Sequence, residues 1–151
     1  MNIEERLQEL GYTLPAPPAP GGLYSPFVKT GNLVFASGFI PAATDEPLKG
    51  KVGLDLTIEQ GQEAACLCVM NMLAAYKNTF GTLNDIKRVV KLVAFIQSAP
   101  DFYSQAQVAN GGSQLIIDLW GTPAPARSAI GMAALPLNVP VEIEAVFEVE
   151  G

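Results

Sequence analysis

A single arginine opens a run of very small side chains, a combination that suits the binding of an anion. Residues 125–134 read P-A-R-S-A-I-G-M-A-A. If this segment is a strand, the alternation of side chains places Arg127, Ala129 and Gly131 on one face. The guanidinium offers a fork of donors that fits a carboxylate, and the small neighbours leave room for one. The segment therefore predicts a notch for a small carboxylate.

Carboxylates follow on the segment that we expect to be the last strand, residues 141–149. Glu142 and Glu144 alternate there with apolar residues, and a row of carboxylates is usually a solvated face. Either one could instead pair with Arg127 across neighbouring strands as an ordinary ion pair. From the residues alone both interpretations of the arginine stay open, because structural ion pairs are far more common than binding sites.

The composition excludes several kinds of chemistry and partner. The chain has 151 residues, the length of one domain, and it contains no histidine. A Ser-His-Asp triad and a histidine-ligated metal are therefore excluded within one chain type, and we expect neither a metal nor a cofactor. The net charge of −6 argues against nucleic acid as the main partner, because contacts to phosphates require a basic face.

The cysteines and the N-terminal residues indicate the compartment. Cys66 and Cys68 lie in a predicted helix and point to different sides, so we expect free, buried thiols. The chain starts with Glu4 and Glu5 in place of a basic leader, and its longest apolar run, 64–70, is too short to span a bilayer. We expect a cytoplasmic protein without a membrane partner. A content of 49% apolar and 16% charged residues also predicts a subunit interface.

The first half of the chain supplies the edge of a sheet and a long helix. A short helix is expected over 3–10, followed by a proline-rich extended segment, so that residues 1–22 form an extension ahead of a domain at 23–151. Strands are expected over 24–29 and 33–37, a polar loop over 42–49, and a weaker strand over 50–56. Thr57 and Gln60 form a capping box that starts a helix running to about Thr79, with Gly81 as its stop.

The second half supplies the central strand and the candidate arginine. An apolar run over 86–96 predicts a central strand, and a second helix starts at Asp101 or Ser104 and ends near Trp120. The sequence Asn110-Gly111-Gly112 inside it indicates either a broken helix or the close approach of another backbone. Residues 127–134 and 141–149 are expected to pair as strands joined by a turn at 135–140.

This order of elements predicts an α+β domain. We expect a mixed or antiparallel sheet with two helices on one face. The other face would carry Arg127, Ala129 and Gly131, and a partner subunit would cover it.

Four segments, in matching order, resemble the RidA/YjgF family, some members of which have been called endoribonuclease L-PSP. They are Gly-Asn-Leu-Val-Phe-Ala-Ser-Gly-Phe-Ile-Pro (31–41), Ile-Lys-Arg-Val-Val-Lys-Leu-Val-Ala-Phe (86–95), Pro-Ala-Arg-Ser (125–128) and Val-Glu-Ile-Glu-Ala (141–145). The resemblance implies a chorismate-mutase-like (YjgF-like) α+β fold and a homotrimer with sites in the clefts between subunits. It also implies hydrolysis of reactive enamines and imines, such as 2-aminoacrylate, to 2-oxoacids and ammonia.

The same resemblance implies roles for five residues. Arg127 would clamp the substrate carboxylate, and Glu142 would orient the attacking water or transfer a proton. Tyr24 on the first strand, Ser37, and Asn110 on the second helix would line the cleft. The archetypal deaminase has a cysteine two residues after the arginine, where this chain has alanine, so the sequence resembles a side branch of the family.

The implied chemistry agrees with the residues that the chain has and lacks. A protonated imine is already electrophilic, so its hydrolysis needs little beyond a held carboxylate and a placed water. The alternative is a non-catalytic trimer that binds a small carboxylate or a partner protein through the same cleft. An endoribonuclease is a weaker hypothesis, because the chain is acidic and has no histidine to act as a base.

Overall fold

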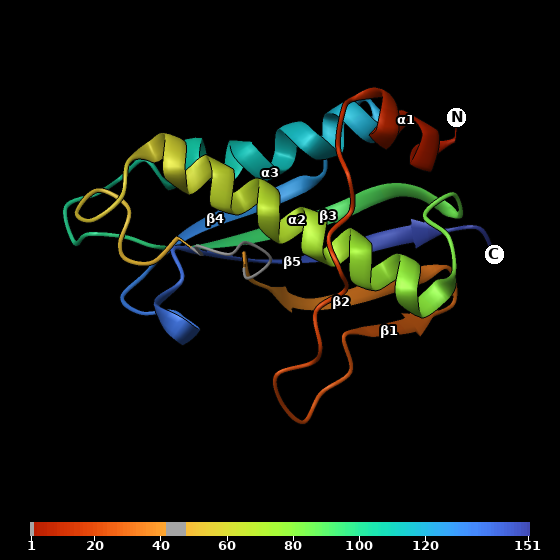
Figure 1. Ribbon diagram of the computed structural model, residues 1–151, viewed down its shortest axis with the longest axis horizontal. Helices are drawn as coiled ribbons and strands as arrows, with labels where there is room; N and C mark the ends of the chain where they lie inside the picture. Colours follow the sequence, from red (N-terminus) through yellow and green to blue (C-terminus); the bar gives the residue numbers. More distant parts are fainter. Residues whose placement is uncertain (1, 42–47) are drawn as a thin grey trace.

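A five-stranded mixed sheet carries two long helices on one face (Figure 1). The computed structural model describes residues 2–41 and 48–151. The predicted α+β class, with two helices on one face of a mixed sheet, is confirmed. In chain order the elements are α1 (Ile3–Glu9), β1 (Phe27–Thr30), β2 (Leu33–Phe39), α2 (Ile58–Phe80), β3 (Ile86–Gln97), α3 (Gln105–Trp120), β4 (Ala126–Met132), the 3-10 turn η1 (Pro136–Asn138) and β5 (Val141–Val149).

Helix α2 begins and ends where local signals predict. The Thr57 hydroxyl accepts a hydrogen bond from the Gln60 amide, and the Gln60 side chain accepts one from the Thr57 amide, at 3.1 and 2.9 Å. Gly81 ends the helix with φ 92°, a left-handed conformation that favours glycine. Between these caps the helix buries a broad apolar surface against the sheet and α3. The capping-box prediction is therefore confirmed.

The two glycines in α3 mark a close contact between the helices. The helix is continuous from Gln105 to Trp120, so the broken-helix alternative is wrong. A Cβ added to Gly111 would collide with the backbone carbonyl of Gln62 in α2. One added to Gly112 would lie 3.1 Å from side-chain carbons of Val69 and Ile143. The glycines allow α2 and α3 to approach each other closely above the sheet.

The strand order is β1-β2-β5-β3-β4, and it corrects one prediction. We expected β4 and β5 to form a hairpin, but β3 lies between them. β3 pairs antiparallel with β5 and parallel with β4. The parallel pairing follows from the connection, because a strand–helix–strand unit brings the second strand back in the direction of the first. The segment between β4 and β5 contains η1 in place of a hairpin turn.

The expected strand over 50–56 is also absent from the described sheet. Val52 forms only isolated bridges to Leu56 and Ser98. Gly50 and Gly53 have φ values of 113° and 87°, which interrupt an extended strand. The polar loop predicted over 42–49 falls mostly on residues 42–47, which lie outside the described residues.

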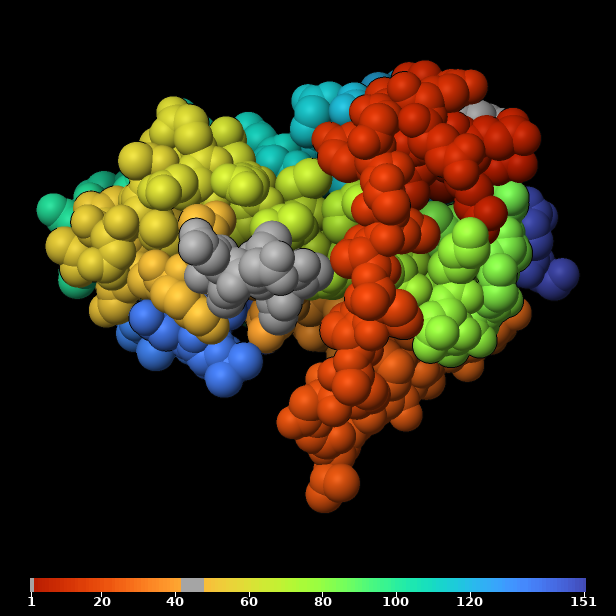
Figure 2. Space-filling model, in the orientation of Figure 1, coloured from red at the N-terminus to blue at the C-terminus, as the bar shows by residue number. Residues whose placement is uncertain are grey.

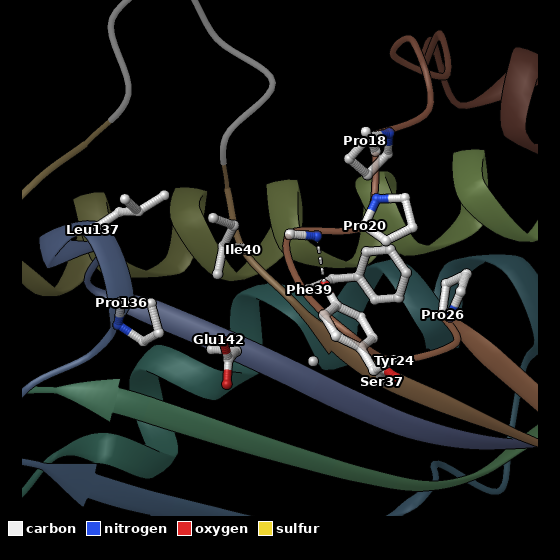
Figure 3. Close-up of a pocket in the computed structure, with 13 residues that line it drawn as sticks. Pro18, Pro20, Tyr24, Pro26, Ser37, Phe39, Ile40, Pro136, Leu137 and Glu142 are labelled. Carbon is white, nitrogen blue, oxygen red and sulfur yellow. Dashed lines mark hydrogen bonds between the residues drawn. The ribbon is translucent and has the colours of Figure 1, made fainter.

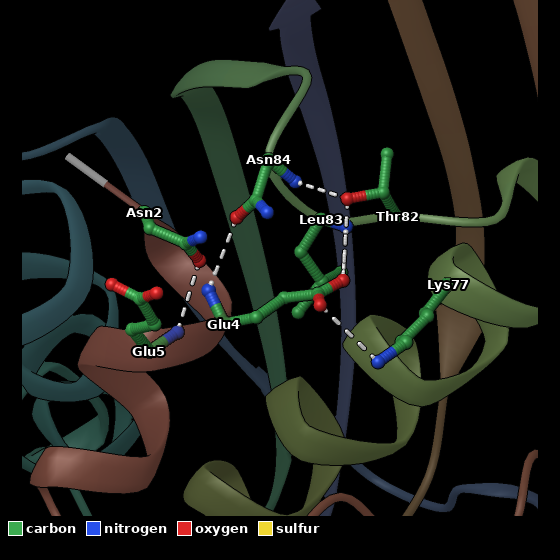
Figure 4. Close-up of polar contacts among 7 residues, drawn as sticks. All are labelled: Asn2, Glu4, Glu5, Lys77, Thr82, Leu83 and Asn84. Atoms are coloured by element: carbon green, nitrogen blue, oxygen red, sulfur yellow. Dashed lines mark hydrogen bonds and ion pairs between the residues drawn. The ribbon is translucent and has the colours of Figure 1, made fainter.

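The Glu4 carboxylate is one of the groups that anchor helix α1 to the body of the protein (Figure 4). The Glu4 carboxylate accepts hydrogen bonds from the Leu83 amide at 3.0 Å and the Thr82 hydroxyl at 3.2 Å, and it pairs with Lys77 at 3.3 Å. These partners, the Leu83 amide foremost, hold the pKa of Glu4 below its usual value. Ile3 and Leu7 belong to the same buried cluster as the sheet. The first helix is thus part of the core packing, whereas the division of the chain into 1–22 and 23–151 stays a prediction.

Residues 12–26, which we call the strap, connect α1 to β1 without regular secondary structure. The strap descends from α1 across α2 to the edge of the sheet, and Figure 2 shows it as a raised ridge on this face. The extended conformation that its prolines predict is confirmed.

Candidate functional site

A pocket of about 790 Å³ lies between the strap, β2, the start of β5 and the η1 turn. In Figure 3 the strap prolines lie on one side and Pro136 with Leu137 on the other, with Glu142 between them. Three of the five predicted site residues, Tyr24, Ser37 and Glu142, line this pocket together. The other lining residues are Pro18, Ala19, Pro20, Gly21, Pro26, Gly38, Phe39, Ile40, Pro136 and Leu137.

Glu142 supplies the acidic group of the pocket. Val141 and Ile143 are fully buried toward the helices, so Glu142 points to the opposite face of the sheet, where it is half-buried. No hydrogen bond or ion pair engages its carboxylate within the described residues. Burial, followed by repulsion from Glu144, raises the pKa of Glu142 above its usual value. Such a carboxylate is a better proton acceptor than an exposed one.

A glycine is required beside this carboxylate. A Cβ added to Gly38 would lie 2.9 Å from the Cδ and Oε2 atoms of Glu142. The pairing of β2 with β5 shifts between Ala36 and Phe39, so Gly38 sits in an irregular stretch of β2. The irregularity and the missing side chain together leave space for the Glu142 carboxylate in the pocket.

Tyr24 and Ser37 form the polar part of the opposite wall. The Tyr24 hydroxyl accepts a hydrogen bond from the Gly21 amide at 3.1 Å, and the Ser37 hydroxyl donates one to the Ser25 carbonyl at 2.6 Å. The first bond lies within the strap, and the second fixes the end of the strap against β2. Tyr24 was predicted to lie on the first strand, but β1 begins only at Phe27, and Tyr24 belongs to the strap. Its phenol is half-exposed and retains a proton to donate.

Arg127 lies elsewhere and faces the helices, which corrects two predictions. It shares a row of the sheet with Leu92 and Ala145, whose side chains are buried toward α2 and α3. Its Nη1 donates to Asn110 Oδ1 at 2.7 Å and to Ser113 Oγ at 3.1 Å. The expected placement on the open face is therefore wrong, and so is the ion pair with Glu142 or Glu144. The physical reason is the strand order, which separates β4 from β5 and sets the face of each residue.

The run of small side chains on β4 lies under α3. Ala129 packs against the core, and a Cβ added to Gly131 would lie 2.8 Å from the Nε2 atom of Gln105. The small residues thus make room for a helix of the same chain. Among the described residues, Arg127 contacts only neutral partners, so its permanent positive charge is not neutralised by a carboxylate.

The five predicted site residues therefore form two groups that a single chain keeps apart. Arg127 and Asn110 lie at the β4 edge of the sheet on the helix-covered side. Tyr24 lies beside β1, the opposite edge strand, and Glu142 occupies a row with Phe95 and Ile130 on the open face. Sequence reasoning missed Ser113 and the apolar wall of the strap. Ser113 could have been predicted from its spacing, because it lies one helical turn after Asn110 and so on the same face of the helix.

No further reactive group was found in the described residues. Residues 2–41 and 48–151 contain no group of three side chains that could hold a metal ion. Both cysteines are free, as predicted, and burial raises the pKa of the Cys66 and Cys68 thiols, so neither is activated. None of the described helices has the length and apolar character of a bilayer-spanning segment.

The fold is an α+β domain of the YjgF type, and comparison with known proteins gives the family. The profile of the family described as "Endoribonuclease L-PSP" matches residues 14–149. A curated relative, "2-iminobutanoate/2-iminopropanoate deaminase" of Dermatophagoides farinae, is 33% identical over 138 residues, 90% of this chain and 93% of its own length. The chain belongs to this family, which is also known as RidA/YjgF, and the resemblance seen in the sequence is confirmed.

Two solved structures illustrate the breadth of the similarity. A protein of unknown function from Agrobacterium tumefaciens is 44% identical, with a TM-score of 0.88, over 98% of this chain and 92% of that chain. TdcF of E. coli, whose structure contains bound serine, is 30% identical, with a TM-score of 0.61, over 93% of this chain and 97% of that chain.

Proposed function

We propose that the protein hydrolyses reactive 2-imino acids, and the enamines in equilibrium with them, to 2-oxoacids and ammonia. The observation that carries the proposal is the half-buried Glu142 carboxylate, which lines the pocket. Its pKa is raised, and it has no hydrogen-bond or ion-pair partner among the described residues. The deaminase name of the mite relative supports the reaction class, and the serine bound to TdcF supports recognition of a small molecule with a carboxylate.

The reaction needs a base, a water and an anchor for the substrate. Glu142 takes a proton from water as the oxygen adds to the C=N carbon, and it returns the proton to the nitrogen. The resulting tetrahedral adduct carries a hydroxyl and an amino group on one carbon. Glu142 then takes the hydroxyl proton and delivers it to the amino nitrogen as the C–N bond breaks, which gives the 2-oxoacid and ammonia. We propose that the Tyr24 hydroxyl, which lines the same pocket, donates a hydrogen bond to the adduct.

The anchor is Arg127, which we propose comes from a neighbouring subunit. The guanidinium carries an unneutralised charge and lies at one edge of the sheet, while the pocket extends to the other edge. An interface that joins different edges of two identical chains is heterologous, and repetition of it closes a ring. The family resemblance implies that this ring is a homotrimer. The open face of the sheet supplies apolar surface for it through Val28, Phe35 and Ile130, which are 57%, 47% and 42% exposed.

The family description as endoribonuclease does not suit this pocket as well. The chain carries a net charge of −6, and the pocket lining contains no lysine or arginine to follow a phosphate backbone. A small carboxylate substrate needs only one cation, which a neighbouring Arg127 provides.

The test is imine clearance in an assay where an amino-acid oxidase makes the imine in situ and semicarbazide traps what remains. We expect Arg127→Ala to lower kcat/KM at least about 30-fold, which corresponds to about 2 kcal/mol for a lost charge-assisted contact. Glu142→Gln should lower kcat by a factor of about 10² or more. Arg88→Ala is the matched control, because Arg88 pairs with Glu148 at 2.7 Å far from the pocket.

Equal clearance by wild type, Arg127→Ala and a blank without enzyme would exclude the enzyme. Binding of pyruvate that disappears in Arg127→Ala, without turnover of any imine, would instead identify a non-catalytic carboxylate-binding protein.

A further inference from the structure

The strap makes the pocket larger and more apolar than a substrate with a minimal side chain requires. Pro18 and Pro20 lie across the pocket from Leu137 (Figure 3), and Ala19 between them in the sequence also lines the pocket. The volume of about 790 Å³ lies in the upper part of the range of about 300–1,000 Å³ that small-molecule pockets span. The imine tautomer of 2-aminoacrylate carries only a methyl group as its side chain, so it offers this apolar wall little surface to contact.

The strap wall is held in place at both ends. At the N-terminal end, α1 is anchored through Glu4 and through the buried Ile3 and Leu7. At the other end, the Ser25 carbonyl accepts a hydrogen bond from the Ser37 hydroxyl of β2, and within the strap the Tyr24 hydroxyl accepts one from the Gly21 amide. Prolines restrict the backbone between these points to extended conformations. A wall fixed in this way selects a ligand by shape.

The facing wall is held just as firmly, although Leu137 is 69% exposed. Leu137 and Asn138 have φ values of 57° and 59°, a conformation that costs energy for residues other than glycine. The buried side chain of Gln97 holds the turn by donating to Asn138 Oδ1 at 2.8 Å and accepting from the Leu135 amide at 2.7 Å. Lys49 donates to the Leu137 carbonyl at 2.9 Å. The exposed leucine is thus presented to the pocket at some energetic cost.

We propose that the strap and Leu137 form a subsite for the substrate side chain, and that the preferred substrates are 2-imino acids with large apolar side chains, of the leucine or phenylalanine type. The inference rests on the proposed function, because it takes the reacting carbon to lie beside Glu142. A substrate placed there directs its side chain between Ala19 and Leu137. Apolar contacts of this kind contribute about 10-fold or more in kcat/KM for each well-packed methylene.

The experiment compares imines that an amino-acid oxidase makes from leucine and from alanine. For the wild type, kcat/KM for the leucine-derived imine should exceed that for the alanine-derived imine at least about 10-fold. Ala19→Phe fills the subsite and should lower this ratio at least about 10-fold. Ala16→Phe is the matched control, because Ala16 is an exposed strap residue that does not line the pocket, and it should leave the ratio unchanged.

A wild-type ratio at or below unity would overturn the inference, while the proposed function would stand. An equal change of the ratio in Ala16→Phe and Ala19→Phe would overturn it as well. If no imine is hydrolysed above background, the proposed function fails, and calorimetry with the two product 2-oxoacids tests the subsite alone. Tighter binding of the leucine-derived 2-oxoacid than of pyruvate, weakened by Ala19→Phe, supports the subsite, and equal binding refutes it.

Discussion

A site shared between subunits makes a quantitative prediction for mixtures of inactive variants. Arg127→Ala chains lack the anchor and Glu142→Gln chains lack the base, so each homo-oligomer is expected to be inactive. When equal amounts are unfolded and reassembled together, a site is intact only where a Glu142→Gln chain supplies Arg127 to an Arg127→Ala chain. Each condition holds for half of the chains, so activity should return to about one quarter of the wild-type value, whatever the number of subunits in the ring.

A second mixture distinguishes a site shared between subunits from a site within one chain. Wild type is reassembled with an equal amount of the double variant Arg127→Ala/Glu142→Gln. A shared site requires two wild-type neighbours and leaves about one quarter of the activity, whereas a site within one chain leaves about one half. The assay is clearance of the oxidase-generated imine, with samples mixed without unfolding as the control. If the first mixture stays inactive and the second retains half, the two half-sites do not meet across an interface, and the proposed geometry is refuted.

Three further predictions concern the carboxylate, the helix contact and the η1 turn. In the proposed reaction Glu142 acts as a base only when it is deprotonated, so kcat/KM should fall as the pH falls through its raised pKa. Because the raised pKa means that the folded state binds this proton more tightly than the unfolded state, the free energy of unfolding in urea should rise over the same pH window, and Glu142→Gln should remove that rise. Gly111→Ala should destabilise the protein by about 1–3 kcal/mol, since overpacking against α2 outweighs the gain in helix propensity, whereas Gln114→Ala on the exposed side of α3 should be nearly neutral in the same denaturation experiment. Gln97→Leu should cost at least about 1–3 kcal/mol by leaving buried polar groups unpaired, and it should lower the leucine-to-alanine imine ratio by releasing Leu137; an unchanged ratio would show that the turn is held without Gln97.

The sequence predicted best those elements whose ends are determined by residues nearby in the sequence. The capping box at Thr57, the left-handed Gly81 and the alternation along β5 are local signals, and each lies where it was expected. The family resemblance predicted the fold in more detail than periodicity did, because it rests on four segments in a fixed order.

The sequence could not predict on which face of the sheet Arg127 lies, because this depends on pairing between segments that are distant in the chain. The sequence shows two strands in succession, 127–134 and 141–149, and a hairpin is the simplest connection between them. Only the parallel register, with Leu92 opposite Arg127, determines that the guanidinium lies under α3. A change of strand neighbour moved the arginine to the opposite face from Glu142.

The lining of the pocket by the strap was missed for a different reason. Proline fixes the conformation of its own backbone but carries no pattern that shows which surface it will cover. The run at 15–20 therefore predicted an extended segment and nothing about its contacts. The packing of Pro18 and Pro20 beside Phe39 becomes visible only when the anchored α1 determines the path of the chain.

The strap lines the pocket with one set of residues and is attached to the rest of the protein through another. Ala19 and its neighbours are exposed to solvent on their outer side and make few hydrogen bonds, whereas the groups that attach the segment are concentrated in α1 and at Tyr24 and Ser25. The middle of the segment can therefore vary in size and shape while the sheet and the acidic group remain as they are. If the strap forms the proposed side-chain subsite, exchange of these few residues between relatives should change substrate preference while Glu142 and Arg127 stay the same.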